Sequence, residues 1–306
     1  MKRQDRPPSR PDHAGIETRP DLSGIAAMAG SSGSRDREFE LSAADFERIR
    51  KLIYDHAGIS LAPAKQDMVY SRLTRRLRAC GDRSFAQYLS RVERDGVEWE
   101  AFVNALTTNL TSFFREAHHF ETLAGRLRSL GTSRTINIWC CAASTGEEPY
   151  SLAITACEAF RSLAPPVSII ASDVNTSVLA HAQRASYSPD RVARMPAAQV
   201  QQFFTRESSP AGEMLTVRPE LKKLINFRPI NLLESNWGVQ SGLDAIFCRN
   251  VMIYFDKQTQ YAILMRFVPL LRPDGLMFAG HSESFLHASD LFRPMGRTVY
   301  QRADHA

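Results

Sequence analysis

Apolar positions along the chain predict a helical region that follows a tail without any hydrophobic period. Residues 1–38 are rich in Arg, Pro, Ser, Gly and Asp, a composition that is typical of a disordered tail. From Phe39 onwards apolar residues recur at intervals of three and four, which is the spacing of one face of a helix. Helices are expected after the capping residue Ser42, from Ala64 to Cys80, and near 84–94 and 98–106.

After Phe120 the pattern changes to short apolar runs that alternate with helical periods. Alternating strands and helices imply a parallel sheet that is covered on both faces. Strands are expected at 135–141, 167–172, 224–230, 244–249 and 275–280, and helices near 147–162, 176–184 and 257–271.

Two further segments modify this sheet. Residues 297–302 follow a turn at 294–296 and are expected to add an antiparallel strand at the edge. The interval between Ser186 and Leu224 is too long for a plain connection and predicts a small β insertion, with a hairpin around 208–212.

Composition and charge exclude some classes of protein. No apolar run approaches ~18 residues, and the N-terminus lacks the apolar stretch of a secretory signal, so neither a membrane span nor export is expected. The five cysteines form no CxxC pair and no metal-like spacing with histidine, which favours reduced thiols in a cytoplasmic protein without a metal. The histidines at 118, 119, 281 and 287 are interpreted as structural or peripheral.

The most informative motif is an acidic turn between the first predicted strand and the next helix. Gly146 is followed by Glu147 and Glu148, and the second predicted strand leads into Asp173. Strand, glycine turn, helix, strand and acid is how nucleotide-like ligands are held, with the acid on the ribose. The turn lacks the spaced glycines of a pyrophosphate loop, and its acidic pair would repel phosphate. S-adenosylmethionine, which carries a ribose and positive charge, fits better than NAD or ATP, whereas a purely structural role of the glutamates at the helix end is the alternative.

Two more segments carry polar side chains at positions where ligand sites form. Residues 107–116 join the helical region to the sheet region and either cap the next helix or line a site. In 244–255 a buried strand leads into Arg249 and Asn250 and then Tyr254, which either faces the ligand crevice or packs in the core. The absence of an Asn-Pro-Pro-Tyr or Asp-Pro-Pro-Tyr motif there argues against a base-amino methyltransferase.

The second helix is strongly basic. Between Lys65 and Arg83 six cations face two acids, a net charge of +4. This excess predicts an anionic partner, either nucleic acid or an acidic protein surface, although a solvated charged face is the simpler alternative. No aromatic residues interleave with the arginines, so stacked single-stranded nucleic acid is disfavoured.

Taken together, these motifs resemble the chemotaxis receptor methyltransferases, the CheR family, over roughly residues 40–302. The resemblance rests on the runs 106–120, 142–152, 172–173, 231–233, 247–256 and 271–284. It implies a class I, Rossmann-like α/β methyltransferase domain with a mostly parallel seven-stranded sheet, an antiparallel last strand and a small β insertion, preceded by a small all-α domain. The expected division is a tail at 1–38, a helical receptor-facing domain at 39–97, a linker at 98–108 and a methyltransferase domain at 109–306, with the insertion at about 186–224.

The resemblance also implies an activity and a set of site residues. The activity is transfer of a methyl group from S-adenosylmethionine to glutamate side chains on the cytoplasmic helices of chemoreceptors, which leaves S-adenosylhomocysteine. Arg115 and Tyr254 would flank the reacting methyl group, with Arg115 also touching the cofactor. The other cofactor residues would be Asn109, Thr111, Glu148, Asp173, Asn231, Leu232, Arg249 and Asn250, with Glu148 at the methionyl end and Asp173 at the ribose. Lys65, Arg72 and Arg78 would bind the receptor.

The expected partner is therefore an acidic receptor helix that meets a monomeric enzyme. Some family members also bind a receptor C-terminal peptide by strand addition to the β insertion. Residues 214–218 could supply the strand here, although the turn of the insertion is poor in glycine. An RNA methyltransferase and a non-catalytic S-adenosylmethionine-binding adaptor are the alternative functions.

Overall fold

The computed structural model describes residues 37–209 and 212–303. The expectations for residues 1–36 and for the turn residues 210 and 211 lie outside this range. Within the described residues, no helix is both long enough and apolar enough to cross a membrane.

The helical region forms as predicted, from four α-helices and one short 3₁₀ turn. Their bounds are α1 Ala43–Ala57, η1 Pro63–Lys65, α2 Gln66–Cys80, α3 Phe85–Val92 and α4 Gly96–Leu106. The Ser42 hydroxyl accepts a hydrogen bond from the Asp45 N–H at 3.0 Å, and Gly81 ends α2 in the left-handed conformation. Apolar residues from all four α-helices make one core. Since α4 occupies most of the expected linker 98–108, the irregular connection begins only at Thr107.

The sheet region has the expected α/β architecture. Its elements are α5 His118–Leu130, β1 Ile136–Cys140, α6 Glu147–Phe160, β2 Val167–Asp173, α7 Thr176–Arg184, β6 Ile225–Pro229, β7 Leu243–Phe247, η2 Met252–Tyr254, α11 Lys257–Phe267, β8 Leu271–Phe278, η3 Leu286–Ala288, β9 Phe292–Gly296 and β10 Val299–Arg302. The seven strands run in the order β6-β2-β1-β7-β8-β10-β9, and the five strands from β6 to β8 are parallel.

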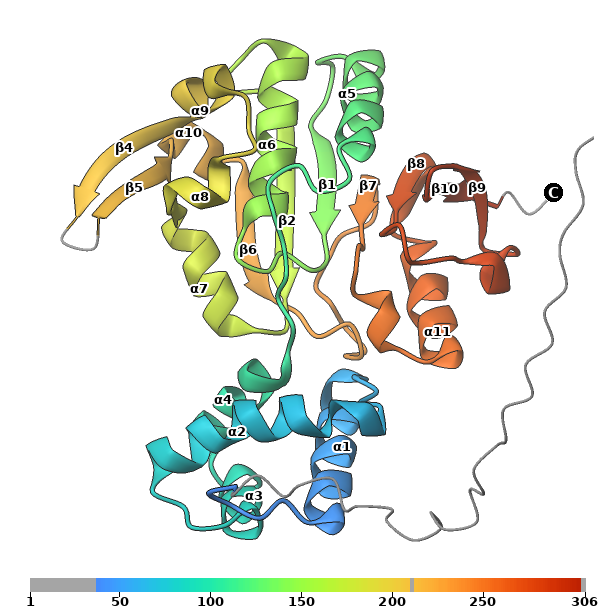
Figure 1. Cartoon of the computed structure of the whole chain (residues 1–306). Coiled ribbons are helices and arrows are strands. Elements are labelled where there is room, and N and C mark those ends of the chain that lie inside the picture. The colour runs from blue at the N-terminus through green and yellow to red at the C-terminus, as the bar shows by residue number, and fades with distance from the viewer. Residues whose placement is uncertain (1–36, 210–211, 304–306) are drawn as a thin grey trace, which may run out of the picture. The chain divides into compact units, whose positions relative to one another are not determined.

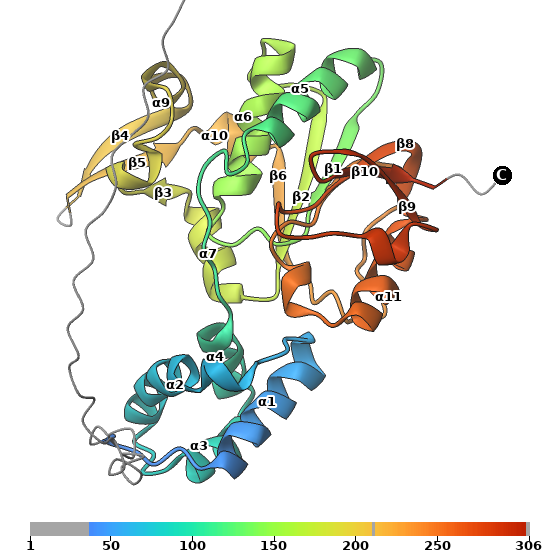
Figure 2. The ribbon, with the colours of Figure 1, turned by 45° about the vertical axis from the view of Figure 1, so that its right-hand side comes forward.

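Residues of the central strand β1 point alternately into two cores. Ile138 and Cys140 join the core on the side of α5 and α6, whereas Trp139 packs on the other face with Phe267 of α11. The helices accordingly cover both faces of the sheet (Figure 1, Figure 2). This two-sided burial explains why the central strands were predictable as short, nearly continuous apolar runs.

The end of the chain differs from the expectation in detail. The predicted turn at 294–296 lies inside β9, and the chain reverses instead at Arg297 and Thr298, whose φ angles are 50° and 57°. Strand β10 is antiparallel to β8, as expected, but β9 lies outside it and forms the edge. An edge strand tolerates Pro294, which is why a proline that suggested a turn is found in a strand.

The β insertion is present and includes helices that were not predicted. It contains β3 Ser186–Tyr187, α8 Pro189–Val192, α9 Ala197–Phe203, β4 Phe204–Ser209, β5 Gly212–Val217 and α10 Pro219–Lys222. The predicted hairpin is β4–β5, and the predicted strand 214–218 is largely β5. The strand order β3-β5-β4 places β5 in the centre, and the edge strands are β4 and the two-residue β3. Helices α8 and α10 are single turns, too short to show a hydrophobic period.

Candidate active site

A cavity of about 410 Å³ lies at the carboxyl ends of the parallel strands and is also lined by the segment from Ala57 to Met68 of the helical region. Its size is that of a site for a small ligand. All of the residues predicted to bind the cofactor or to catalyse line it: Asn109, Thr111, Arg115, Glu148, Asp173, Asn231, Leu232, Arg249, Asn250 and Tyr254. The strand-end argument therefore predicted the place of the cavity correctly.

Four non-glycine residues around this cavity have left-handed backbones. They are Phe114 (φ 52°), Glu116 (φ 59°), Ser144 (φ 47°) and Asn250 (φ 58°). Such conformations cost of order 1 kcal/mol each and are found preferentially at functional sites, where the surrounding structure holds them in place. Two of these residues, Ser144 and Asn250, line the cavity, so part of its lining has a strained backbone.

Asp173 is held rigidly at the end of β2. Its carboxylate accepts the N–H of Ser144 at 2.9 Å through Oδ2 and the N–H of Asn175 at 2.9 Å through Oδ1. Burial raises the pKa of Asp173 to about 6, although the backbone hydrogen bonds oppose the shift. Each carboxylate oxygen can accept more than one hydrogen bond, so ribose hydroxyls can still be bound.

The two glutamates of the acidic turn have different surroundings. Gly146 has φ 100°, and a Cβ atom there would lie 2.6 Å from the Tyr187 hydroxyl, so only glycine fits. The Glu147 side chain is fully buried, forms an ion pair with Arg191 of α8 and accepts a hydrogen bond from the Thr145 hydroxyl at 2.6 Å. Glu148 alone of the pair lines the cavity.

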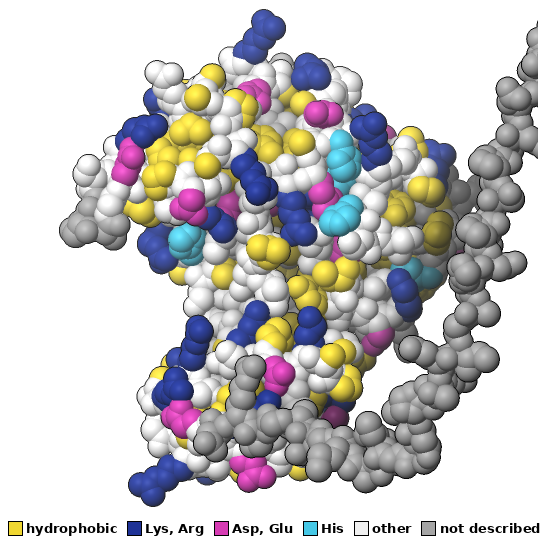
Figure 3. All heavy atoms as spheres, in the orientation of Figure 1, with side chains coloured by type: hydrophobic (Ala, Val, Ile, Leu, Met, Phe, Trp, Pro, Cys, Tyr) yellow, Lys and Arg dark blue, Asp and Glu magenta, His cyan; other side chains and the backbone are white. Residues whose placement is uncertain are grey.

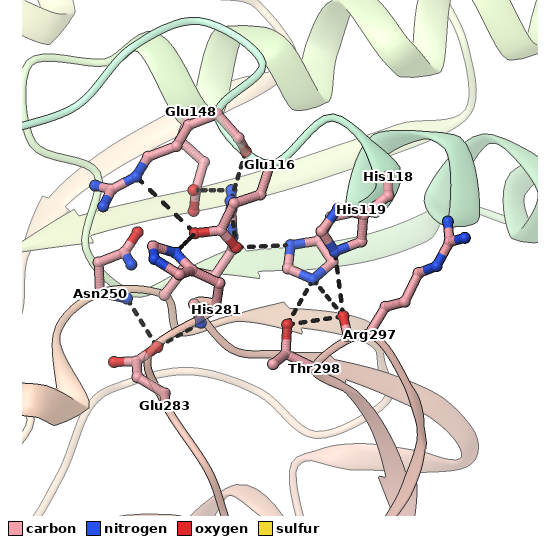
Figure 4. Close-up of polar contacts among 12 residues, drawn as sticks. Glu116, His118, His119, Glu148, Asn250, His281, Glu283, Arg297 and Thr298 are labelled. Atoms are coloured by element: carbon pink, nitrogen blue, oxygen red, sulfur yellow. Dashed lines mark hydrogen bonds and ion pairs between the residues drawn. The ribbon is translucent and has the colours of Figure 1, made fainter. Parts of the chain in front are cut away.

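Glu148 belongs to a buried charge cluster around Arg249. The Arg249 Nη1 donates to Glu148 Oε2 at 2.5 Å, and its Nη2 donates to the Arg115 carbonyl oxygen at 2.5 Å. Figure 4 labels Glu148 and Glu116, the two carboxylates of this cluster. Glu116 Oε2 lies 3.1 Å from the same Nη2. Burial lowers the pKa of Arg249, but the two carboxylates outweigh it and leave the pKa raised. Arg249 is therefore the centre of an ion cluster and not a free edge of the cleft.

Glu116 and Glu148 respond differently to this cluster. Burial raises the pKa of Glu148 in spite of Arg249. Burial acts in the same direction on Glu116, but His281, whose Nδ1 lies 3.0 Å away, and Arg249 together lower its pKa to about 2. Glu116 was not predicted as a functional residue, since a glutamate next to Arg115 in a junction gives no signal of an ion pair with a residue 133 positions later.

The side chain of Asn231 and the backbone of Asn250 hold loops at the cavity in place. Asn231 Nδ2 donates to the His56 carbonyl oxygen of α1 at 2.5 Å, and its Oδ1 accepts the Leu233 N–H at 3.0 Å. The Asn250 N–H donates to Glu283 at 2.8 Å. Asn231 thus ties the loop after β6 to the helical region, and both ends of its side-chain amide are engaged.

Arg115 and Tyr254 line the same cavity from two sequence-distant segments. Arg115 is 29% exposed, and its Nη1 donates to the Leu110 carbonyl oxygen at 3.0 Å. The backbone carbonyl of Tyr254 accepts the Ser60 N–H at 3.0 Å, which joins η2 to the helical region. The structure therefore brings the two predicted catalytic residues to one site.

The predicted receptor-facing cations have different surroundings. Lys65 is exposed and lines the cavity. Arg78 is exposed on α2, outside the cavity lining. Arg72 donates to the Leu106 and Thr107 carbonyl oxygens at 3.0 and 2.8 Å and so caps the C-terminus of α4.

The excess of positive charge on α2 is smaller than the sequence suggested. Arg76 is paired with Glu98 at 2.6 Å, and the same carboxylate accepts the Tyr88 hydroxyl at 2.8 Å. The acid lies two helices further along the chain, so a count over the helix alone missed it. Figure 3 shows acidic side chains among the basic ones on this part of the surface.

The fold and the site define a class of enzyme. Three features are those of an S-adenosylmethionine-dependent methyltransferase. They are the sheet order, the glycine turn without a phosphate loop, and buried carboxylates at the C-terminal end of β2 and the N-terminal end of α6. Two family models match the chain, "CheR methyltransferase, all-alpha domain" over residues 44–107 and "CheR methyltransferase, SAM binding domain" over residues 109–301. The chain belongs to the CheR methyltransferase family.

Similar proteins carry consistent names. The chain is 53% identical over 269 residues to chemotaxis protein methyltransferase 2 of Pseudomonas aeruginosa, which covers 88% of this chain and 96% of the relative. It is 51% identical to the chemotaxis protein methyltransferase of Klebsiella aerogenes, over 85% of this chain and 90% of the relative, and 49% identical to that of Escherichia coli, over 85% and 91%. S-adenosylmethionine is thus the methyl donor that the site binds.

Proposed function

We propose that this enzyme methylates glutamate side chains on the cytoplasmic helices of chemoreceptors and forms glutamyl methyl esters for adaptation in chemotaxis. The observation that carries the proposal is the position of Arg115 and Tyr254 in the same cavity as the acidic cofactor residues Glu148 and Asp173. An arginine and a tyrosine are suited to bind and orient an anionic acceptor.

The acceptor needs orientation more than activation. A glutamate side chain has a pKa of ~4.3 and is already ionised at pH 7, so no general base is required. S-adenosylmethionine supplies the electrophilic methyl group. Arg115 steers the carboxylate, and Tyr254 holds it in line with the methyl carbon. Orientation of this kind contributes roughly 7–11 kcal/mol to lowering the barrier. The interaction between Arg115 and the acceptor carboxylate must stay weak, because a tight ion pair would stabilise the ground state.

We assign the cofactor contacts by the same reasoning. Glu148 holds the methionyl ammonium, and Asp173 holds the ribose hydroxyls. Asn109, Thr111, Leu232 and Asn250 contact the cofactor directly. Asn231 contributes through its backbone, because its side chain is bound to α1 and to Leu233, and Arg249 acts through Glu148.

We further propose that Lys65 and Arg78 contact the acidic receptor helix in the cytoplasm, and that the enzyme acts as a monomer. Lys65 supports this because it is exposed and also lines the cavity. Arg72 also has a structural role, since its guanidinium donates a hydrogen bond to the Thr107 carbonyl oxygen at the end of α4. A receptor C-terminal peptide would add as a further strand to an edge of the β3-β5-β4 sheet, which contains the predicted strand 214–218. Titration with such a pentapeptide tests this part, and no binding at high micromolar concentration would reject it.

Methyl transfer from radiolabelled S-adenosylmethionine tests the function. Receptor fragments should gain label that base releases as methanol, and Arg115→Ala should abolish transfer while S-adenosylhomocysteine still binds. Label in RNA, or a base-stable product, would reject the glutamate assignment. Full transfer by the variant would reject the role of Arg115.

A further inference from the structure

The charge cluster behind the cavity contains one cation and two anions. The Arg249 side chain is completely buried and lies between Glu148, at 2.5 Å, and Glu116, at 3.1 Å. Both carboxylate side chains are only 10% exposed. One guanidinium cannot neutralise two carboxylates, so the cluster retains one negative charge in a region of low dielectric.

The buried histidine beside Glu116 does not change this charge balance at neutral pH. His119 Nδ1 lies 3.5 Å from Glu116, and burial followed by the field of Arg249 lowers the pKa of His119 to about 4. His119 is therefore neutral, and its Nε2 contacts the Arg297 carbonyl oxygen at 3.0 Å. His281 touches Glu116 from the solvent side, with 66% of its side chain exposed. Its hydrogen bond to Glu116 helps to keep that carboxylate ionised.

The backbone places Glu116 for this contact. Its φ of 59° is unusual for glutamate, and it follows Arg115, whose carbonyl oxygen accepts a hydrogen bond from the same guanidinium. Arg249 is thus bound on one side to Glu148 and on the other to the backbone and side chain of two consecutive junction residues.

We propose that Glu116 is a positioning residue of the cofactor site: it shares the charge of Arg249, so that Glu148 keeps negative charge for the ammonium group of S-adenosylmethionine. This rests on the proposed contact between Glu148 and the methionyl end. With Glu116 neutral, Arg249 would be matched by Glu148 alone, and a cationic group in the cavity would gain much less. Glu116 would affect the amino-acid end of the cofactor and not its nucleoside end.

Calorimetric titration of the full chain with two ligands tests this at pH 8, above the ordinary titration range of imidazole. S-adenosylhomocysteine carries the ammonium group, whereas 5′-methylthioadenosine keeps the nucleoside and the thioether but lacks the amino acid. Glu116→Gln keeps the size of the side chain and removes its charge. We expect this variant to raise the Kd of S-adenosylhomocysteine about tenfold, which corresponds to the loss of one charged hydrogen bond. The Kd of 5′-methylthioadenosine should change less than about twofold.

Matched variants separate the possible outcomes. Glu121→Gln, an exposed glutamate in the first turn of α5, should leave both affinities unchanged. Glu116→Asp, which restores the charge, should recover most of the discrimination between the ligands. An equal loss of both ligands in Glu116→Gln would overturn the proposal, because it would indicate a merely structural role.

Glu148→Gln distinguishes this proposal from the assignment on which it rests. If Glu148→Gln weakens only S-adenosylhomocysteine and Glu116→Gln changes neither ligand, the role of Glu116 is refuted and the assignment of Glu148 stands. If Glu148→Gln leaves the ratio of the two affinities unchanged, the methionyl assignment itself is wrong.

Discussion

Replacing Arg191 by methionine should destabilise the protein by about 2 kcal/mol, because it leaves the buried Glu147 carboxylate without its cation. Glu147 is fully buried at the start of α6, and its other side-chain partner is the Thr145 hydroxyl. Breaking a buried ion pair from one side costs about 3–5 kcal/mol. The Arg191 side chain is 37% exposed, so solvent screening reduces this value.

A double-mutant cycle in urea measures the coupling. The variants are Arg191→Met, Glu147→Gln and both together, and the double variant should be about as stable as Glu147→Gln alone. The control is Arg206→Met, which removes the exposed partner of Glu213 in the same insertion and should change stability by less than about 0.5 kcal/mol. Additive effects of the two changes, or a loss below 0.5 kcal/mol for Arg191→Met, would refute the reasoning.

Three further changes have definite expected outcomes. Gly146→Ala should cost at least about 2 kcal/mol in urea melts, since the left-handed backbone and the Tyr187 hydroxyl both oppose a Cβ atom; a loss under 0.5 kcal/mol would contradict this. The raised pKa of Asp173, about 6 against 3.8, means that its contribution to stability is present at pH 3 and lost as pH rises through 6. Asp173→Asn should therefore flatten the change in the urea midpoint of the ligand-free protein between pH 4 and 6, and an unchanged slope would argue against the shift. Arg72→Met should lower stability by about 1–2 kcal/mol, because the Thr107 carbonyl oxygen loses its hydrogen bond. Replacing the exposed Arg75 by methionine should not lower stability, and equal effects of the two changes in thermal melts would exclude the capping role.

The sequence was sufficient for elements whose burial follows a period. Strands β1, β2 and β7 are apolar runs flanked by turns, and helices α1 and α2 have caps at Ser42 and Gly81. Short elements were missed, because one turn of helix such as α8 or α10 contains too few residues to show a stripe. The turn before β10 was misplaced, because Pro294 suits an edge strand as well as a turn.

The location of the site residues was predictable, but the direction of several side chains was not. The carboxyl ends of parallel strands meet at one edge, so Asp173 and Arg249 had to be near each other. That rule does not predict which group a side chain at a strand end binds. Arg249 points to two glutamates, and the Asn231 amide points to α1, because their partners come from parts of the chain that only the fold brings together.

The acidic turn shows how the fold assigns different tasks to neighbouring residues of one type. Successive residues on a helix point about 100° apart, so Glu147 and Glu148 cannot face the same cavity. Glu147 faces the insertion and is matched by Arg191, 44 positions away, whereas Glu148 faces the cavity and is matched by Arg249, 101 positions away. The first pair is electrically neutral, because one cation balances one anion. The second contains an extra carboxylate, from Glu116, and this surplus of negative charge is what suits the cavity side of the turn to a cationic methyl donor.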